Sequence, residues 1–524
     1  MKYPIFTLEE DKNNTFSYAE YPDAIETGSF LQIKEYSDSI EIKVDKFSTI
    51  PFYYIVIEKK LYGSTKLNLL IEKLPKQYEK KLNIEAAIEF LRTNTLIADK
   101  TFIEGIKRIS FGHVLSFDKR SGNYQEKEYW KLSGDISILS KKDMLNNLEE
   151  SFLNTIKKQV KNSGKIGIHL SGGMDSRNIM GALLRMDIPF KTYTYGVKEN
   201  LDVQVAKLVS EKLSLNSKFL EWDGVSSFKK NADLHFDLTD GMQSLIHGHG
   251  IEIHETEAKE VDTILYGHFL DFFIQGHMYN KNFEGKKTER TNEYLYQLFN
   301  GGPCSIMRGD TIEHKMLTNN YHGMFRNSIE NEIQKLDYMI PEKQYDALYF
   351  IHHGLRRLMP QVQSGAHFLD FKSPGLQEEY FNLAWTVPGH YRKDRKLQEE
   401  LLRRLHRGMM ELPIVKDNKC LSYMGSNKSK RLLSKSKNKI QSSRAGFLFN
   451  EYDYYGKGIQ ELANIQLFHF MKEEILLAKV ERFGFLKEEY IASLFQTGKF
   501  TMGISFYSTL YTLSKFVNRY RLET

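Results

Sequence analysis

A glycine-rich turn between a strand and a helix constrains this chain more than any other feature of its sequence. The run Lys165–Met186 has the sequence KIGIHLSGGMDSRNIMGALLRM, in which a short apolar strand leads through the turn into a helix. Gly172 and Gly173 let the backbone turn sharply and approach a ligand closely, because glycine carries no Cβ atom. Ser171 and Ser176 add hydroxyl groups, and the helix directs free N–H groups and the positive end of its dipole toward the same point. The unit therefore predicts a cradle for a phosphate or pyrophosphate group.

A carboxylate lies inside this turn. Asp175 follows the two glycines, and a carboxylate beside phosphates is commonly a ligand of Mg²⁺. The turn is not a Walker A loop, which requires Gly-Lys-Ser or Gly-Lys-Thr after four intervening residues. The other interpretation is a serine- and glycine-rich loop that caps the helix without a ligand. Two glycines, two serines and an aspartate at one strand-to-helix junction favour the ligand-binding interpretation.

Length and composition predict a two-domain protein. The chain has 524 residues, of which 41% are hydrophobic, so it can bury two large cores. Its only cysteines are Cys304 and Cys420, which excludes a disulfide framework and a cysteine zinc site. No run is long and apolar enough to span a bilayer, and the first residues lack the apolar segment of a signal peptide. We therefore expect a cytoplasmic protein with no membrane partner.

Positive charge gathers in one segment, although the net charge of the chain is only +6. Residues 416–444 contain many lysines and arginines and almost no acid. Such a run is typical of a solvated or disordered segment. A flap over phosphates and a grip on nucleic acid are the other interpretations. No pattern of an RNA- or DNA-binding module accompanies the run, so we do not expect nucleic acid as the main partner.

The first part of the chain has the pattern of a β-rich domain. Short alternating or apolar runs, such as SIEIKV (39–44) and FYYIVIE (52–58), are separated by turn residues. One helical segment, LNIEAAIEFLRT (82–93), follows them. We assign this domain to residues 1–135.

Residues 136–524 have the pattern of an α/β domain. The strand before the glycine-rich turn is followed by a strand at 190–197, a helix at 202–215 and a strand at 218–222. Apolar strands that alternate with amphipathic helices predict a parallel sheet covered on both faces, and the remaining residues predict a helical extension. Such sheets bind their ligands at the carboxyl ends of the strands, which is where the turn falls.

The SGGMDS turn resembles the PP-loop of the ATP pyrophosphatases, which split ATP into AMP and pyrophosphate. It is most similar to the asparagine-synthetase-like branch, which activates a carboxylate as its acyl-adenylate and lets an amine displace AMP. Further matches to this branch occur in the same order on both sides of the turn, at 45–54, 102–118, Tyr129-Trp130 and 374–388. The resemblance implies a glutaminase-like α+β first domain of the Ntn type and a PP-loop α/β ligase domain with a helical extension.

The resemblance also implies which residues bind ATP and Mg²⁺. Backbone groups of Tyr195 and Gly196, at the end of the strand after the PP-loop helix, would contact the adenine. In DTILYGHFLDFFIQG (262–276), Gly267 matches a glycine of a second family segment, and Asp271 matches its aspartate. Asp271 would then share the Mg²⁺ ion with Asp175. The implied nucleotide-binding residues are Leu170, Ser171, Gly172, Gly173, Asp175, Ser176, Tyr195, Gly196 and Gly267.

A histidine follows Gly267 at the position where asparagine synthetases have a glutamate and β-lactam synthetases have a tyrosine. An amine is mostly protonated at neutral pH and must lose a proton before it attacks a carbonyl carbon. A side chain with an unperturbed pKa near ~6.5 suits that task. The resemblance therefore implies a catalytic role for His268. The other interpretation is an ordinary polar residue in a surface loop.

A lysine near the end of the family's usual core is the second candidate catalytic residue. Lys419 follows Leu412-Pro413 at nearly the spacing that the family shows between its Leu-Pro and an active-site lysine. A cation there would stabilise the negative charge that builds during adenylation and acyl transfer. Lys416 is the alternative candidate, and a lysine of the basic segment without a role is the other interpretation.

The first domain departs from the family at its start. Members that take nitrogen from glutamine use a cysteine directly after the start methionine as the nucleophile of a glutamyl thioester. Lys2 stands at that position, and no cysteine precedes Cys304. We therefore expect the first domain to be a scaffold without glutaminase activity. The resemblance then points to the branch with inactive glutaminase domains, the β-lactam synthetases and the lasso-peptide macrolactam synthetases.

These inferences predict an ATP- and Mg²⁺-dependent ligase that adenylates a substrate carboxylate and joins it to an amine without glutamine. Attack by an amine of the same molecule, such as a peptide precursor, would close a macrolactam ring. An ammonia-dependent asparagine synthetase and an RNA-binding, tRNA-modifying PP-loop protein are the alternatives. Residues 281–338 carry no motif that we can interpret, and we expect them to determine substrate specificity or to contact an accessory protein of the pathway.

Overall fold

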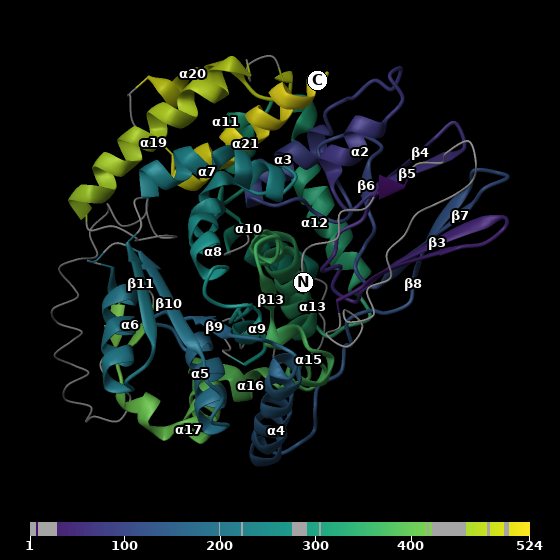
Figure 1. The fold of residues 1–524 in the computed structure, drawn as a ribbon. Coiled ribbons are helices and arrows are strands. Elements are labelled where there is room, and N and C mark those ends of the chain that lie inside the picture. Colours follow the sequence, from purple (N-terminus) through teal and green to yellow (C-terminus); the bar gives the residue numbers. More distant parts are fainter. Residues whose placement is uncertain are drawn as a thin grey trace.

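The computed structural model describes most of the chain. The described residues are 7–8, 29–196, 198, 200–221, 224–274, 291–302, 305–416, 419–421, 457–478, 483–496 and 502–523. The first part of the chain forms antiparallel sheets, and the second part forms a parallel sheet surrounded by helices (Figure 1). None of the described helices combines the length and the hydrophobicity that crossing a bilayer requires.

Two four-stranded antiparallel sheets make up most of the first part, which confirms the predicted β-rich domain. One sheet has the order β1 (Thr7–Leu8), β5 (Lys60–Ser64), β4 (Tyr53–Ile57), β6 (Lys107–Arg108), and the other has the order β2 (Leu31–Glu35), β3 (Ser39–Val44), β7 (His113–Asp118), β8 (Tyr124–Glu128). In β3, Ile40, Ile42 and Val44 are buried and the residues between them are not, as the alternating run predicts. These side chains share one core with Phe52 and Leu61 of the other sheet.

Two helices, α2 (Leu67–Lys73) and α3 (Ile84–Thr93), complete this α+β part. Asn83 caps α3 by accepting the N–H of Ala86, and Asn94 ends the helix in the left-handed conformation. That this part is a glutaminase-like domain of the Ntn type stays a prediction. The division of the chain at residue 135 also stays a prediction.

A five-stranded sheet in which all strands are parallel forms the centre of the second part, as the sequence predicts. Its order is β11 (Ser217–Glu221), β10 (Lys191–Gly196), β9 (Ile166–His169), β12 (Thr263–Leu265), β13 (Asp370–Lys372). The chain passes from β9 through α5 (Asp175–Arg185) to β10, and later returns to the other side of β9 with β12. The strand that precedes the SGGMDS turn is therefore the central strand.

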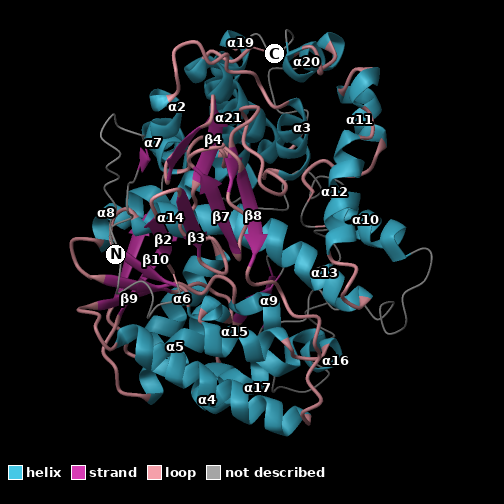
Figure 2. Ribbon diagram, turned by 90° about the vertical axis from the view of Figure 1, so that its right-hand side faces the viewer, coloured by secondary structure: helices cyan, strands magenta, loops and turns pink. Residues whose placement is uncertain are grey.

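Helices cover the parallel sheet and extend from it. Figure 2 shows α4 (Lys141–Val160), α5, α15 (Glu378–Trp385) and α17 (Lys396–Leu405) gathered at one end of the molecule. The other helices of this part are α6 (Leu201–Lys212), α7 (Gly224–Leu238), α8 (Ile251–Glu257), α9 (Leu270–Ile274), α10 (Thr291–Gly301), α11 (Thr311–Met316), α12 (Met324–Lys335), α13 (Pro341–Tyr349), α14 (Met359–Ala366), α16 (Gly389–Arg392), α19 (Lys457–Leu477), α20 (Glu488–Phe495) and α21 (Ile504–Tyr520). A π-helix, η4 (Phe350–Leu358), joins α13 to α14, and a short 3-10 helix, η1 (Leu245–Gly250), precedes α8.

The two parts share a continuous hydrophobic core. Phe47 of the first part contacts Phe350 and Phe381 of the second, with ring centroids 5.9 and 4.7 Å apart. The helix α21, near the end of the chain, lies beside α3 (Figure 1), and the rings of Phe102 and Phe516 are 5.0 Å apart. This shared core fixes the position of the first part on the helical extension.

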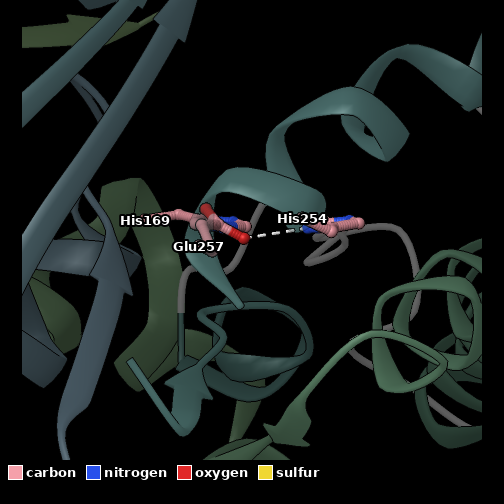
Figure 3. A group of neighbouring side chains, drawn as sticks. All are labelled: His169, His254 and Glu257. Atoms are coloured by element: carbon pink, nitrogen blue, oxygen red, sulfur yellow. Dashed lines mark hydrogen bonds and ion pairs between the residues drawn. The ribbon is translucent and has the colours of Figure 1, made fainter. Parts of the chain in front are cut away.

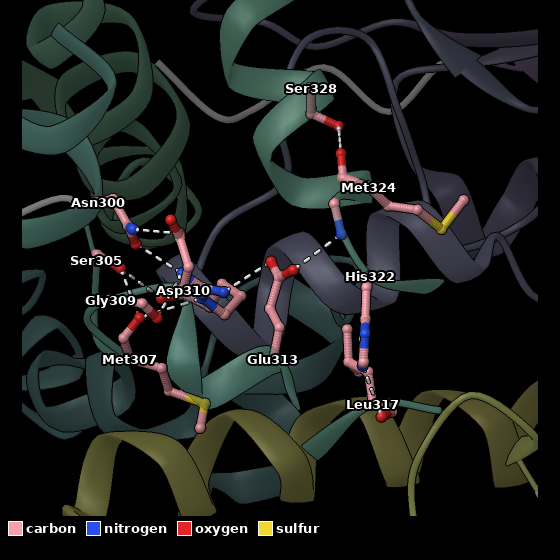
Figure 4. A network of polar contacts seen from close by, with 12 residues as sticks. Asn300, Ser305, Met307, Gly309, Asp310, Glu313, Leu317, His322, Met324 and Ser328 are labelled. Atoms are coloured by element: carbon pink, nitrogen blue, oxygen red, sulfur yellow. Dashed lines mark hydrogen bonds and ion pairs between the residues drawn. The ribbon is translucent and has the colours of Figure 1, made fainter. Parts of the chain in front are cut away.

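A buried arginine joins the first part to a segment that has no sequence motif. Arg92 of α3 is fully buried, and its guanidinium donates to Glu313 Oε1 (2.7 Å), Asn300 Oδ1 (2.6 Å) and the carbonyl oxygen of Met307 (3.1 Å). Figure 4 shows these acceptors converging between α10 and α11, and Glu313 also accepts the N–H of Gly323 (3.0 Å). In the 281–338 stretch, α10 and α11 are thus anchored to the first part, while residues 281–290 and 303–304 lie outside the described residues.

Candidate functional site

The SGGMDS loop lies at the carboxyl end of β9, and short-range hydrogen bonds hold its shape. Gly173 N–H donates to Ser171 Oγ (3.2 Å), and Ser171 N–H donates to Ser176 Oγ (3.3 Å). The helix α5 begins at Asp175, directly after the loop. The order of strands reverses at β9, since β10 lies on one side of it and β12 on the other. Open α/β sheets bind their ligands at this edge, so the predicted phosphate cradle has the position that its role requires.

Gly172 is required by close contacts within the protein. Its N–H donates to Oδ1 of Asp202 in α6 (2.8 Å), and its carbonyl oxygen accepts the N–H of Val415 (2.9 Å). A Cβ atom at this position would lie 2.3 Å from Val415 Cγ2 and 2.8 Å from Asp202 Oδ1. The sequence predicts glycine here for the close approach of a ligand. The structure adds two protein segments that approach equally closely.

We expect the replacement Gly172→Ala to weaken ATP binding on the order of 100-fold, because the new methyl group must displace the loop by about an ångström. Calorimetric titration with ATP and Mg²⁺ measures the change. The matched control is Gly134→Ala, where the nearest atom to the new Cβ is 3.5 Å away. Adding Val415→Ala to Gly172→Ala should recover part of the affinity. Unchanged ATP affinity in Gly172→Ala would contradict the predicted role of the loop.

The structure brings Gly267 against the PP-loop. Gly267 follows β12, and a Cβ atom there would lie 3.2 Å from Cβ of Asp175 and 3.4 Å from the N atom of Ser176. Oδ1 of Asp175 accepts a hydrogen bond from Nε2 of the buried Gln398 in α17 (2.6 Å). Asp271 lies in α9, and its side chain lies outside the described residues. Shared binding of Mg²⁺ by Asp175 and Asp271 therefore stays a prediction.

The predicted adenine-binding residues lie at the end of the neighbouring strand. The loop is tied to β10 by Thr194 Oγ1, which donates to the carbonyl oxygen of Leu170 (2.7 Å). Gly196 ends β10 with φ +147°, a value that favours glycine, and a Cβ atom there would lie 2.9 Å from Val203 Cγ2. Tyr195 is half-buried beside it. Their position next to the loop fits the predicted role, which no contact in the structure tests.

His268 lies on the same edge of the sheet, immediately after Gly267. Its ring stacks on Tyr266, with centroids 3.9 Å apart and planes 19° apart, and Nε2 lies 3.3 Å from Gln361 Oε1. The next residue, Phe269, has φ +73°, which is a strained conformation for a side chain of this size. Burial lowers the pKa of His268 to about 3, so the imidazole is neutral at physiological pH.

A chain of polar side chains leads from His268 through the buried His247 and Asn94 into the first part of the protein. Gln361 Nε2 lies 2.9 Å from His247 Nδ1, and His247 Nε2 lies 2.9 Å from Asn94 Nδ2. Asn94 Oδ1 accepts the hydroxyl of Thr509 (3.3 Å). Burial lowers the pKa of His247 well below its usual value, so its ring is neutral and carries a single N–H. A neutral His247 ring can donate one hydrogen bond and accept one, which limits how the amide groups of Gln361 and Asn94 are oriented. The orientation of the Gln361 amide then determines whether Gln361 donates to His268 or accepts from it.

Two histidines and a glutamate form a second polar group at the end of β9 (Figure 3). Glu257 of α8 is fully buried, and its carboxylate oxygens lie 2.6 Å from His169 Nε2 and 2.9 Å from His254 Nδ1. Burial alone would raise the pKa of Glu257, but the two histidines outweigh it and lower the pKa to about 2. Two ligands of a tetrahedral zinc ion at ~2.1 Å lie about 3.4 Å apart. The 2.6 Å separation therefore identifies a hydrogen-bonded buried carboxylate, although the three residue types could hold a metal after rearrangement.

A hairpin places the candidate lysines beside the PP-loop. The strands β14 (Ile414–Lys416) and β15 (Lys419–Leu421) pair so that Lys416 is opposite Lys419, and β14 carries the Val415 N–H that binds the loop. Arg177 of α5 is fully buried and donates to the carbonyl oxygens of Leu412 (3.4 Å) and Pro413. The side chains of both lysines lie outside the described residues. The catalytic role of Lys419 stays a prediction that the position of its backbone supports.

Several residues of the site could not be inferred from the sequence. Asp202 contacts the loop, and Arg177 contacts the carbonyl oxygen of Pro413 just before the hairpin. Gln361 contacts His268, and Glu257 contacts His169. Most of their partners lie 30 to 236 positions away in the chain. No local pattern marks such pairs, because the fold alone brings them together. Only Arg177 carried a signal, as a charged residue directly after SGGMDS in an otherwise buried helix.

A parallel sheet with an SGGMDS loop at the carboxyl end of its central strand defines a nucleotide-binding α/β domain. The model of the family described as asparagine synthase matches residues 147–498, more than half of the chain, and the chain belongs to this family. The family consists of ATP-dependent carbon–nitrogen ligases that form AMP.

A curated relative was also found. The chain is similar to the amidase chyE of Penicillium rubens, with 26% identity over 144 residues. The match covers 26% of this chain and 20% of the length of that protein. The likeness therefore concerns a limited segment of the relative.

Proposed function

We propose that this protein adenylates a substrate carboxylate with ATP, releases pyrophosphate, and joins the acyl group to an amine that does not come from glutamine. One observation carries the proposal. The PP-loop, the Gly267–His268 turn and the β14–β15 hairpin come from distant parts of the chain and meet at one edge of the parallel sheet. An ATP-dependent ligase needs a phosphate cradle, a proton acceptor and a cation at the same place.

The loop residues would hold the phosphates of ATP. The N-terminus of α5 favours an anion, and the carboxylate of Asp175 at its first position is a donor that Mg²⁺ prefers. Asp175 and Asp271 are the residues that would hold the ion. Bound Mg²⁺ neutralises negative charge on the pyrophosphate as it leaves.

His268 would accept the proton of the attacking amine at its imidazole. A neutral ring is the form that can accept a proton, and burial keeps the ring neutral. A phosphate at the neighbouring loop raises the pKa of the ring, since a nearby opposite charge favours the protonated form. The stack on Tyr266 and the contact with Gln361 hold the ring in one orientation.

Independence from glutamine rests on the sequence of the first part. Residues 1–303 contain no cysteine. A cysteine thiolate is the nucleophile that forms the glutamyl thioester in glutamine-dependent members. The amine would therefore be ammonia or a group of the substrate itself. Within the substrate, attack on the adenylate closes a lactam, and a linear peptide with a free amine and an Asp or Glu side chain is the substrate class we favour.

The reaction products test the proposal. The full chain is incubated with ATP, Mg²⁺ and one carboxylate at a time: linear peptides with a free N-terminus, and aspartate with ammonium. We expect AMP and pyrophosphate together with a peptide that has lost one water. Formation of asparagine would instead identify an ammonia-dependent synthetase. ADP and phosphate as products would contradict the adenylation step.

His268→Gln is expected to separate the two half-reactions. Adenylation, followed as exchange of labelled pyrophosphate into ATP, should stay within a few-fold of the unchanged protein. Amide formation should fall by about 10²–10⁴-fold, the usual contribution of a general base. The matched control is His390→Gln, which replaces an exposed histidine. Equal losses in both half-reactions would show that His268 supports the fold of the site and does not accept the proton.

A further inference from the structure

A cavity lies between the first part of the protein and the helices of the second. Its walls carry the cationic side chains of Lys66, Lys100, Arg108 and Arg356, and the carboxylate of Asp240 is the acidic group among its lining residues. The two lysines and Arg108 come from the first part, and Arg356 and Asp240 come from the second. The space that water-sized spheres can enter is about 40 Å³, a few times what one water molecule needs. The proposed ATP site does not include any of these residues.

Part of this positive charge is compensated by protein groups. Lys100 pairs with Glu89 (2.5 Å) and Glu85 (3.3 Å). Lys66 Nζ donates to the carbonyl oxygen of Leu238 (2.8 Å). The two lysines therefore have acceptors of their own in the protein.

Neither guanidinium group forms an ion pair within the described part of the chain. Arg356 forms no hydrogen bond and no ion pair with any residue that the structure describes. Arg108 donates to the carbonyl oxygen and to Oγ of Ser48 (2.7 and 3.2 Å), and it forms no ion pair within the described part of the chain. Burial, and then the positive charge of Arg108, lower the pKa of Arg356 to about 9, although the negative charges of Asp99 and Glu332 offset part of this shift. Two guanidiniums that repel each other in a cavity are costly unless an anion lies between them.

An unusual helix presents Arg356 to the cavity. Arg356 lies in η4, a nine-residue π-helix between α13 and α14. π-helical segments are rare, mostly single turns, and frequent at functional sites. Pro360 and Gln363 of α14 line the same cavity, and Gln361 between them contacts His268. One side of the cavity is thus formed by α14, whose Gln361 contacts the candidate base His268.

We propose that this cavity binds a small molecule through a carboxylate or phosphate group held by Arg356 and Arg108. Guanidinium forks match the two oxygens of such groups, which donors on lysine do not. The proposal does not depend on the reaction that the ligase catalyses. A molecule bound here touches Pro360 and Gln363 of α14, which lie on either side of the Gln361 that contacts His268.

Titration of the full chain with inorganic phosphate and with acetate, at constant ionic strength set by NaCl, tests the site. We expect one of the two anions to raise the temperature of unfolding saturably, and Arg356→Met to weaken that binding by at least tenfold. Saturation by phosphate alone identifies a phosphate-bearing ligand, and saturation by acetate identifies a carboxylate. The control Arg120→Met, in an exposed ion pair with Asp38, should keep the response.

Two further variants keep the result decisive. Gly172→Ala is expected to weaken phosphate binding at the PP-loop. A response that this variant loses and Arg356→Met keeps therefore belongs to the ATP site and overturns the proposal. Arg356→Lys keeps the charge but not the fork, and it should bind more weakly than the unchanged chain. Without phosphate or acetate, Arg356→Met should unfold at the same or a higher temperature, since an unpaired charge is removed. A lower temperature together with an unchanged anion response would show a purely structural arginine.

Discussion

Arg92→Met is expected to lower the free energy of unfolding by about 3–5 kcal/mol, the usual cost of breaking a buried ion pair from one side. Arg92 is fully buried, and its partner Glu313 has a side chain that is 6% exposed. The substitution leaves the carboxylate of Glu313 without its cation in a place that water does not reach. Asn300 and the carbonyl oxygen of Met307 lose their donors at the same time. Urea denaturation followed by circular dichroism measures the loss.

A second substitution tests whether the stranded charge causes this loss. Glu313→Gln in the Arg92→Met background removes the charge but keeps an acceptor for the N–H of Gly323. The double variant should therefore be more stable than Arg92→Met alone. Arg120→Met breaks an ion pair whose side chains are 78% and 49% exposed, and it should change stability by less than about 0.5 kcal/mol. Equal losses in Arg92→Met and Arg120→Met would show that burial of the pair is unimportant.

The unchanged protein loses free energy of unfolding as the pH falls from about 6.5 to about 4. We expect His352→Leu to reduce that loss by about 3 kcal/mol. His352 is 1% exposed, and burial lowers its pKa to about 4. Between the two pKa values the unfolded chain binds a proton that the folded chain does not. The histidine therefore destabilises the folded state by up to ~1.4 kcal/mol for each pH unit as the pH falls through this range. Leucine does not bind a proton in either state, so the variant does not lose stability in this way.

The comparison at neutral pH completes this test. Neither ring nitrogen of His352 has a hydrogen-bond partner among the described residues, and Nε2 lies 3.6 Å from Glu332 Oε2. His352→Leu should therefore be at least as stable as the unchanged chain near pH 7.5, because an apolar side chain replaces an uncompensated polar one. Urea midpoints at several pH values give the difference, with the exposed His390→Gln as control. A difference that does not grow with acidity would contradict a neutral buried ring.

Local sequence patterns predicted the elements that carry the site. The run around Gly172 predicted a strand, a turn and a helix, and these are β9, the PP-loop and α5. The alternation in 39–44 predicted which side chains of β3 are buried. Such features depend on the conformations of neighbouring residues and on their spacing, which a single stretch of sequence contains.

These local patterns did not predict contacts between residues that are distant in the sequence. Asp202 binds Gly172 across 30 positions, and Arg177 binds the carbonyl oxygen of Pro413 across 236. The hydrogen-bonded side chains from His268 to Asn94 connect the two parts of the protein. The cavity at Arg356 is lined by residues from both parts. None of these residues has a spacing that indicates its partner.

The sequence by itself determined the strand–turn–helix unit around SGGMDS, the alternation of strands and helices, and the family, because each is encoded in residues that lie next to one another. Only the tertiary structure decided that β9 is the central strand, that a hairpin closes on Gly172, and that His268 is neutral. The reason is physical. Strand order, burial and the charge of a buried ring depend on which surfaces meet when the whole chain is packed, and that outcome is a property of the complete fold.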